Sequence, residues 1–435
     1  MRRFLTSPAV QRTGLVCCLL GLIALGLWMA VLHVRAEYHL RQAQQALTRQ
    51  RYRLALTELH QALRFRPRSG ALHLLAGRTA RQSGNFPLAW EHLHRCRELE
   101  KGVSAELQLE EYLLRAQGGE VDQVYPYLAV YLFQEGPQTP LVLESLAHVY
   151  LHTYQFERAL KCLNRWLVLQ PDNVQALFLR GTYYSMTAKA ELAVEKAAAD
   201  LRRVLELVPE HVPARLLLAR TLYDGSHYEK AAAEYKIVLE QEPDNFAARV
   251  GLATYLLLIG QWTEARPLVE GLYRENPDHA AVLHLKGRLA EADGRLDEAV
   301  RFLQASLAAK PSDNLTCYHL VRCYQRLGDD AAAGKCLDQL DRIEKDQERL
   351  LDITNRQSEA LVSDPALCCE LGEVCLRLGI QQRGLHWLHA ALRIDPHYRR
   401  AHEQLLRYYE AQGTTAEKEA AFHRQQLRLL AQTEP

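Results

Sequence analysis

The sequence lacks an excess of charge of either sign. Its 435 residues include 53 lysines and arginines against 52 aspartates and glutamates, which leaves a formal net charge of +1. No continuous basic stripe runs along it, so nucleic acid is not an expected partner. Almost no segment alternates polar and apolar residues with the period of two that marks a half-buried strand. A Rossmann or TIM-type catalytic domain therefore has no place in the chain.

Catalytic motifs are also missing. The chain contains no G-x-x-x-x-G-K-[ST] phosphate loop, no G-x-G-x-x-G after a strand, no G-x-S-x-G elbow and no H-E-x-x-H helix. We therefore expect a protein that is not an enzyme, that holds no cofactor and that has no small-molecule substrate.

The ten cysteines lack the regular spacing of a small secreted disulfide scaffold. Two stretches suggest a metal site: "CCELGEVC" (368–375), with two histidines after it, and "HLHRC" (92–96). Tetrahedral zinc needs four convergent ligands. Cys368 and Cys375 instead take inward helix positions where other parts of the chain carry Leu or Tyr. Packing explains them more simply, and no metal is expected.

One long apolar run stands near the start of the chain. After a short basic tail (1–13), residues 14–34 read "GLVCCLLGLIALGLWMAVLHV", without Asp, Glu, Lys or Arg. At about 1.5 Å per residue, a helix of that length reaches roughly 30 Å, the thickness of a bilayer's hydrocarbon core. We predict one transmembrane helix over 14–34. A cleavable signal peptide is the competing interpretation, but the run is long for that role and no A-x-A-like site follows cleanly.

The charges leave open the side of the membrane on which the rest of the chain lies. Arginines flank both ends of the run: Arg2, Arg3 and Arg12 before it, and Arg35, Arg41, Arg49, Arg51 and Arg53 after it. The positive-inside rule therefore does not decide the orientation of this segment in the membrane. A short tail, one anchor and a large domain favour an exported, periplasmic or otherwise extracytoplasmic domain, whereas the thiols in that domain favour the opposite side. Our expectation is a single-pass membrane protein with an exported domain.

Most of the remaining chain repeats itself. The prolines Pro137 and Pro171 are 34 residues apart, the same interval separates successive members of Pro209, Pro243, Pro277 and Pro311, and Pro171 and Pro209 are 38 apart. Small residues recur at fixed distances before these prolines and before Pro67. Twelve places before a proline stand Ala55, Ala159, Ala197, Ala231, Ala265 and Ala299, and twenty-four places before stand Ala43, Ala147, Ala219, Ala253 and Gly287.

These residues fit a helical hairpin. Small side chains at fixed places let two antiparallel helices approach closely. Proline disfavours helix in the residue before it, so the second helix of each pair ends there. Asp or Asn just after the proline, as in "EPDNFAARVGLA", can cap the next helix. Such a unit cannot bury its apolar face alone and must stack on its neighbours.

This pattern resembles the tetratricopeptide repeat, whose unit has this length and this order of small, aromatic, small and proline residues. The resemblance covers nearly all of residues 36–428. It implies an all-α, right-handed α-solenoid of about ten helical hairpins with a concave inner face, preceded by the transmembrane helix. We divide the solenoid into a first part (36–340, degenerate around 97–137), an extended helix and linker (341–364), and a C-terminal hairpin with capping helices (365–430).

In this family the concave face is lined by first-helix residues, and the repeat phase predicts them here. The candidate partner-binding residues are Arg78, Arg81, His148, Arg220, Tyr223, His284, Arg288, Tyr318, Arg322 and Arg326. Arg binds carboxylate bidentately and Tyr supplies stacking area, so the expected ligand is an extended, mildly acidic protein or peptide segment. The alternative, ordinary solvated side chains on a helix, stays open. The lysine and asparagine pattern with which some members clamp heat-shock chaperones is not visible.

The leading hypothesis is a non-catalytic scaffold that is tethered to a membrane and binds protein partners in its groove. Tethering would raise the local concentration of whatever the groove collects. Two alternatives stay open: an assembly or secretion factor whose client is a nascent or exported chain, and a regulatory subunit of an envelope-associated enzyme complex.

Overall fold

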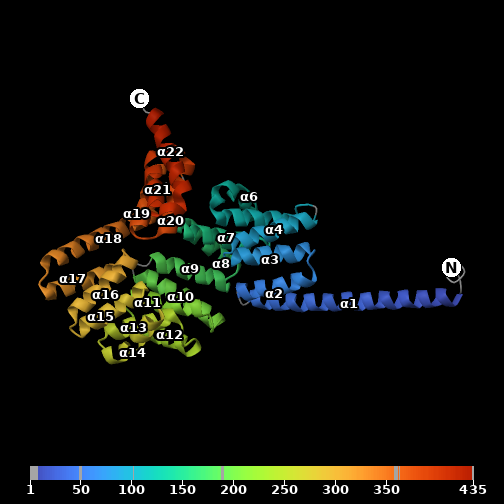
Figure 1. Cartoon of the computed structure of the whole chain (residues 1–435), viewed down its shortest axis with the longest axis horizontal. Coiled ribbons are helices and arrows are strands. Elements are labelled where there is room, and N and C mark those ends of the chain that lie inside the picture. Colours follow the sequence, from blue (N-terminus) through green and yellow to red (C-terminus); the bar gives the residue numbers. More distant parts are fainter. Residues whose placement is uncertain are drawn as a thin grey trace. The chain divides into compact units, whose positions relative to one another are not determined.

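The computed structural model is helical throughout the residues that it describes, without a strand among them (Figure 1). The backbone is described for residues 8–48, 51–100, 102–187, 191–356, 361 and 363–433. Within these ranges, the side chains of residues 8–25, 27, 355, 356, 414 and 433 are not described. The chain divides into two compact units, Met1–Leu146 and Ala147–Pro435.

The first unit begins with a long helix and continues with shorter ones. Its elements are α1 (Pro8–Thr48), α2 (Tyr52–Phe65), α3 (Gly70–Gln82), α4 (Phe86–Glu100), α5 (Ala105–Arg115), a π-helical turn (Ala116–Glu120) and α6 (Val121–Gln134). Helix α7 (Thr139–His152) runs from the first unit into the second. The C-terminal part of α1 belongs to the core, because Ala43 shares an apolar cluster with Leu59 and Ala76.

The predicted transmembrane segment lies within α1. Helix α1 includes residues 14–34, but the side chains of 14–25 and 27 lie outside those that the structure describes. Among the side chains that are described, no helix is long and apolar enough to cross a membrane.

The second unit holds the regular repeats. After α7 come α8 (Phe156–Leu169), α9 (Val174–Thr187), α10 (Glu191–Leu207), α11 (Val212–Asp224), α12 (Tyr228–Gln241), α13 (Phe246–Leu258), α14 (Trp262–Glu275), α15 (Ala280–Ala292), α16 (Leu296–Ala309), α17 (Asn314–Leu327), α18 (Asp330–Arg356), α19 (Pro365–Arg377), α20 (Gln381–Ile394), α21 (Arg399–Ala411), a 3-10 turn (Gly413–Ala416) and α22 (Glu417–Thr433).

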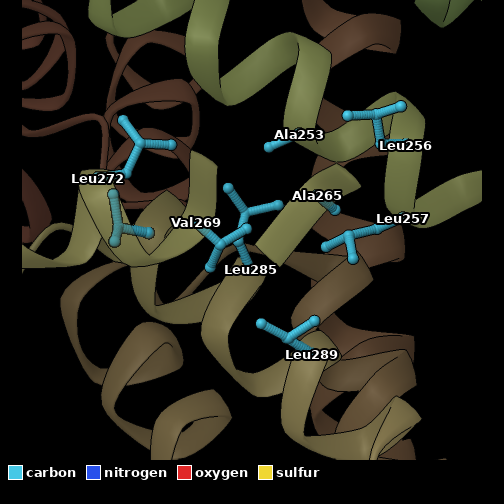
Figure 2. Close-up of a cluster of buried hydrophobic side chains, with 9 residues drawn as sticks. Ala253, Leu256, Leu257, Ala265, Val269, Leu272, Leu285 and Leu289 are labelled. Atoms are coloured by element: carbon cyan, nitrogen blue, oxygen red, sulfur yellow. The ribbon is translucent and has the colours of Figure 1, made fainter. Parts of the chain in front are cut away.

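From α9 onward, each odd-numbered helix pairs with the helix after it, and that second helix packs on the next pair. First helices of neighbouring pairs also touch, as α13 and α15 do. The interior therefore runs from one hairpin into the next. Figure 2 shows such a cluster, in which Ala253 and Leu257 of α13 and Val269 of α14 meet Leu285 of α15. The predicted stack of helical hairpins is confirmed.

Two glycines show why the first helix needs a small residue at a fixed place. A Cβ atom added at Gly287 would come within 2.6 Å of Leu303 Cγ on the second helix of the same pair. A Cβ atom at Gly372 would come within 2.7 Å of Leu388 Cγ. Alanine fills the matching place in other first helices, as Ala253 of α13 does, which is 0% exposed. The predicted close approach of the two helices is confirmed at these positions.

Asparagine after the repeat proline caps the following helix, as predicted. The Asn245 side chain accepts a hydrogen bond from Ala248 N at 3.0 Å. The equivalent Asn173 accepts one from Ala176 N, also at 3.0 Å. Asp313 precedes α17 without such a bond, because its carboxylate accepts the hydroxyl of Thr316 at 2.6 Å.

Two segments depart from the repeat pattern. Around 97–137 the chain passes through the π-helical turn, in which Gly119 takes a φ of 102° that glycine alone adopts readily. Helix α18 continues through residue 340 and ends at Arg356. The division of the solenoid at 340 and 364 stays a prediction.

The cysteines of α19 lie in the core. Cys368 and Cys375 are 0% exposed, and the Cys368 thiol donates a hydrogen bond to Leu361 O at 3.1 Å. Burial raises the pKa of Cys375 to about 12, so this thiol stays protonated at neutral pH. Within the part of the chain that the structure describes, no three His, Cys, Asp or Glu residues are placed to hold a metal ion.

Candidate partner-binding site

One position of the repeat carries arginine in several first helices. Eleven residues after a repeat proline stand Arg78 in α3, Arg220 in α11, Arg288 in α15 and Arg322 in α17. All four are among the predicted partner-binding residues. Because they share one position, differences between them come from the neighbouring helices.

Three of these arginines have a carboxylate partner. Arg78 Nε donates to Glu110 Oε1 at 2.5 Å. Arg220 lies 3.7 Å from an aspartate one turn further along its own helix, and its side chain is 75% exposed, so solvent weakens that pair. Arg322 Nη2 lies 3.3 Å from Glu291 Oε1.

Arg288 differs from the other three. It is 8% exposed, yet no atom of the described residues accepts a hydrogen bond from its guanidinium. Burial lowers the pKa of Arg288, while Tyr223 and Glu291 favour its charged form and Arg322 disfavours it. Its nitrogens are not among the fully buried side-chain atoms that lack a partner, so solvent reaches them. Of the four arginines at this position, Arg288 is the one without a carboxylate at ion-pair distance among the described residues.

The hairpin before α15 supplies no counter-charge at this level. The residue of α13 equivalent to Arg288 is Thr254, whose hydroxyl donates to Val250 O of its own helix at 2.8 Å. The electrostatic neighbour from further back is Tyr223 of α11, whose ring packs against Tyr228 at 5.1 Å. Burial raises the pKa of Tyr223, so it stays a neutral phenol beside Arg288.

His284 lies one turn before Arg288 and has an unused acceptor. Its Nδ1 is 2.8 Å from the Thr316 hydroxyl, and that hydroxyl donates its only proton to Asp313 at 2.6 Å. The Nδ1 atom of His284 must therefore carry the proton of that contact, which leaves a lone pair on Nε2. Nε2 is buried and has no partner among the described residues. Burial, followed by nearby positive groups, lowers the pKa of His284 to about 3.

Glu291 holds the other side of this group together. Its Oε2 lies 2.8 Å from His319 Nδ1, and its backbone carbonyl accepts from Arg326 Nη1 at 3.4 Å. Burial raises the pKa of Glu291, but the hydrogen bond with His319 and the arginine charges outweigh it and hold the pKa below its usual value. We call His284, Arg288, Glu291, His319 and Arg322 the α15–α17 cluster.

A second group of charges lies in the first unit, where Arg78 and Arg81 of α3 face Glu110 of α5. Arg81 is 2% exposed and its Nε donates to Glu110 Oε2 at 2.9 Å, so one fully buried carboxylate serves both arginines. Close by, burial raises the pKa of Glu144. We call Arg78, Arg81 and Glu110 the α3–α5 cluster.

The structure therefore divides the ten predicted residues. It brings together His284, Arg288 and Arg322, with Tyr223, Tyr318 and Arg326 beside them. Arg78 and Arg81 belong to the α3–α5 cluster. Arg220 extends into solvent, and His148 lies 3.3 Å from the Gln175 amide. Nothing in this geometry tests whether they bind a partner, so that role stays a prediction.

Sequence reasoning missed Glu110, Thr316 and His319. Glu110 lies in the degenerate segment, where the repeat phase cannot be followed. Thr316 and His319 flank the predicted Tyr318 on α17. The signal that could have found His319 is its spacing from Arg322 and Arg326, which places all three on one side of the helix.

Models of the tetratricopeptide repeat match residues 40–94, 193–245, 216–279 and 251–314, and a second model of the same repeat matches 290–355. No curated protein matches the chain. Among solved structures, MamA from Desulfovibrio magneticus RS-1 is 20% identical over 39% of this chain and 97% of that one, with a TM-score of 0.30.

Two further solved structures are similar over longer stretches. A tetratricopeptide repeat protein from Parabacteroides merdae is 17% identical over 66% of this chain and 97% of that one, with a TM-score of 0.35. The human IFIT1 dimer with m7Gppp-AAAA is 15% identical over 83% of this chain and 90% of that one, with a TM-score of 0.41. The family models, with the helical hairpins at their repeat spacing, show that the chain belongs to the tetratricopeptide repeat family.

Proposed function

We propose that the protein is a non-catalytic scaffold that binds an extended acidic segment of a partner protein at the α15–α17 cluster. The observation that carries this proposal is Arg288, which is buried and has no hydrogen-bond acceptor although the equivalent arginines are paired. A carboxylate can accept two parallel hydrogen bonds from one guanidinium, which is the strongest common way to satisfy it.

The surroundings of Arg288 suit a peptide rather than an isolated anion. Tyr318, which is 51% exposed, offers ring surface beside Arg322. A segment whose Asp or Glu side chain meets the donors of Arg288 can lay a neighbouring side chain on that ring. His284 Nε2 is fully buried, so it is not an acceptor that a partner reaches directly.

We also propose that residues 14–34 anchor this scaffold in a membrane, with the repeats on the extracytoplasmic side. The support is the uncharged run itself and its length. Washing membranes with alkaline carbonate tests the anchor, since an integral protein stays in the pellet and a chain without residues 1–34 is released. Protease added to sealed vesicles of known sidedness tests the side.

Binding to the α15–α17 cluster can be tested with the full chain in detergent and a fluorescent peptide of alternating glutamate and glycine. Fluorescence anisotropy should show binding to this peptide and weak binding to a matched glutamine–glycine peptide. Arg288→Gln removes charged hydrogen bonds, so we expect about a tenfold to hundredfold loss of affinity for the glutamate peptide.

The matched control is Arg301→Gln, an exposed arginine on the second helix of the same hairpin, which should leave the affinity unchanged. Equal affinity for the glutamate and glutamine peptides would overturn the proposal. So would an equal loss in the Arg288 and Arg301 variants. If an oligoribonucleotide binds more tightly than the glutamate peptide, and this binding needs Arg288, the ligand of the cluster is a nucleic acid and not a protein segment.

A further inference from the structure

The turn inside each hairpin takes a left-handed backbone conformation at one repeat position. Seventeen residues before the repeat proline, Gly260, Gly294 and Gly379 have φ values of 76°, 77° and 74°. Glycine is the residue that adopts this conformation without steric conflict. At the same position Ser226 has φ 61° and Tyr154 has φ 58°. A bulky tyrosine there is strained, so other contacts must hold it in place.

One contact of Tyr154 comes from α20, in the hairpin before the last one of the second unit. Its side chain is buried, with the residue 6% exposed, and the guanidinium carbon of Arg383 in α20 stands 4.2 Å from its ring centre. A guanidinium over an aromatic face at this distance is an attractive cation–π contact, and burial strengthens it. Phe156 packs edge-on against the other part of the ring at 5.3 Å.

The whole turn around Tyr154 is buried, which sets it apart from the equivalent turns. Thr153 is 7% exposed and Gln155 8% exposed. At the corresponding turn between α13 and α14, Gly260 and Gln261 are exposed, and Trp262 is 37% exposed. Turns normally lie at the surface, because their backbone groups need water. Helices α8 and α18 also touch each other, so the first hairpin of this unit meets a later one.

We propose that Tyr154 and Arg383 form a clasp that joins the first hairpin of the second unit to α20. With the clasp closed, the curvature of the intervening hairpins is fixed, and with it the spacing of Tyr223, Arg288 and Arg322 on the first helices. With the clasp open, the turn relaxes and the stacked hairpins can spread. The closed form is only moderately favoured, because it holds a tyrosine in a conformation made for glycine. Control of partner binding by this clasp rests on the proposed function, whereas the clasp itself does not.

Energy transfer between two fluorophores tests the clasp without any partner. The full chain carries the dyes on unnatural amino acids at Lys161 in α8 and Lys345 in α18, whose side chains are 69% and 72% exposed, so the native cysteines stay untouched. Arg383→Ala and Tyr154→Gly should each lower the transfer efficiency. The combined variant should lower it no further than either change alone, because both changes remove one contact.

Two control variants separate the clasp from general damage to the fold. Ser226→Gly makes the same backbone change as Tyr154→Gly in a hairpin without a clasp, and it should leave the transfer efficiency unchanged. Tyr154→Phe keeps the ring under Arg383 and should stay closed. Unchanged efficiency in Arg383→Ala and Tyr154→Gly would overturn the proposal, as would additive losses in the combined variant. Loss of glutamate-peptide binding in a protein that remains closed would count against the binding site and not against the clasp.

Discussion

The α3–α5 cluster and the α15–α17 cluster place arginine at the same repeat position and use it differently. In the first, Glu110 is 0% exposed and accepts hydrogen bonds from both Arg78 and Arg81. In the second, the one carboxylate, Glu291, is engaged by His319 and lies close to Arg322. The first cluster pairs its arginine charges inside the protein, except that Arg81 Nη2 is buried without a hydrogen-bond partner. In the second, no described residue accepts a hydrogen bond from Arg288.

The difference comes from the neighbouring first helix. In α5, six residues after the N-cap Ser104, the chain carries Glu110, which accepts from the arginines of α3. In α17, six residues after the N-cap Asp313, it carries His319, which contacts Glu291 and adds no carboxylate for Arg288. The comparison teaches that a repeat position does not by itself make a binding site. The state of its neighbours decides whether it is structural or available.

The largest expected loss of stability follows from removing the buried carboxylate of Glu110. Glu110→Gln leaves Arg81, 2% exposed, and its neighbour Arg78 without a negative partner. Breaking a buried ion pair from one side costs about 3–5 kcal/mol of unfolding free energy. Urea unfolding followed by circular dichroism measures this loss. The control is Glu229→Gln, an exposed glutamate in α12, which should change stability very little. A loss as small as that of the control would mean that the two clusters do not differ.

The sequence predicted the hairpins because their determinants are local. Two small residues and a proline recur at one interval. The packing reason for the small residues is confirmed at Gly287 and Ala265. Caps such as Asn245 are local as well. The repeat position that carries arginine in several first helices was predicted from the same periodicity.

The pairing state of each arginine could not be predicted in this way. It depends on which side chain the neighbouring hairpin brings within reach. For Arg78 that side chain lies in the degenerate segment, where the repeat phase cannot be followed. The contact of Tyr154 with Arg383 joins residues that lie far apart in the sequence of one unit. No periodic pattern contains such a contact.

In a second feature the two units agree. "HQALRFRPRSGALH" (60–73) and "HAALRIDPHYRRAH" (389–402) share the spacing H-x-A-L-R-x-x-P-x5-H. In both, Nε2 of the last histidine faces the carbonyl oxygen of the proline, at 3.2 and 3.0 Å. Its Nδ1 therefore accepts, and it lies 3.0 Å from His92 Nδ1 in one unit and 2.9 Å from His423 Nδ1 in the other. Each of these contacts uses one proton, so the hydrogen bonds of both histidine groups are complete while the histidines are neutral.

Acid should therefore weaken both units, an effect of intermediate size. Burial and neighbouring histidines lower the pKa of His92 and of His423 to about 4. A histidine with a lowered folded-state pKa contributes stability that is complete above its ordinary value of about 6.5 and is lost as the pH falls from there towards 4. Urea midpoints measured from pH 7.5 to pH 5 should fall, and His92→Gln combined with His423→Gln should flatten that slope. His94→Gln, at a side chain 72% exposed, should not. A slope that the double variant leaves unchanged would assign the acid effect to other groups.

The smallest expected change in stability belongs to Arg288→Met, and it is the sharpest test of the comparison. Methionine keeps much of the side-chain volume and removes a buried cation that no described residue hydrogen-bonds, so the unfolding free energy should stay within about 1 kcal/mol of the parent or rise slightly. Arg81→Met is the matched change in the other cluster and should cost clearly more, because Arg81 donates to Glu110. Urea unfolding of the two variants side by side gives the answer. If both lose the same stability, the cation of α15 is structural like that of α3. If Arg288→Met alone keeps its stability while losing the glutamate peptide, its charge serves a partner and not the fold.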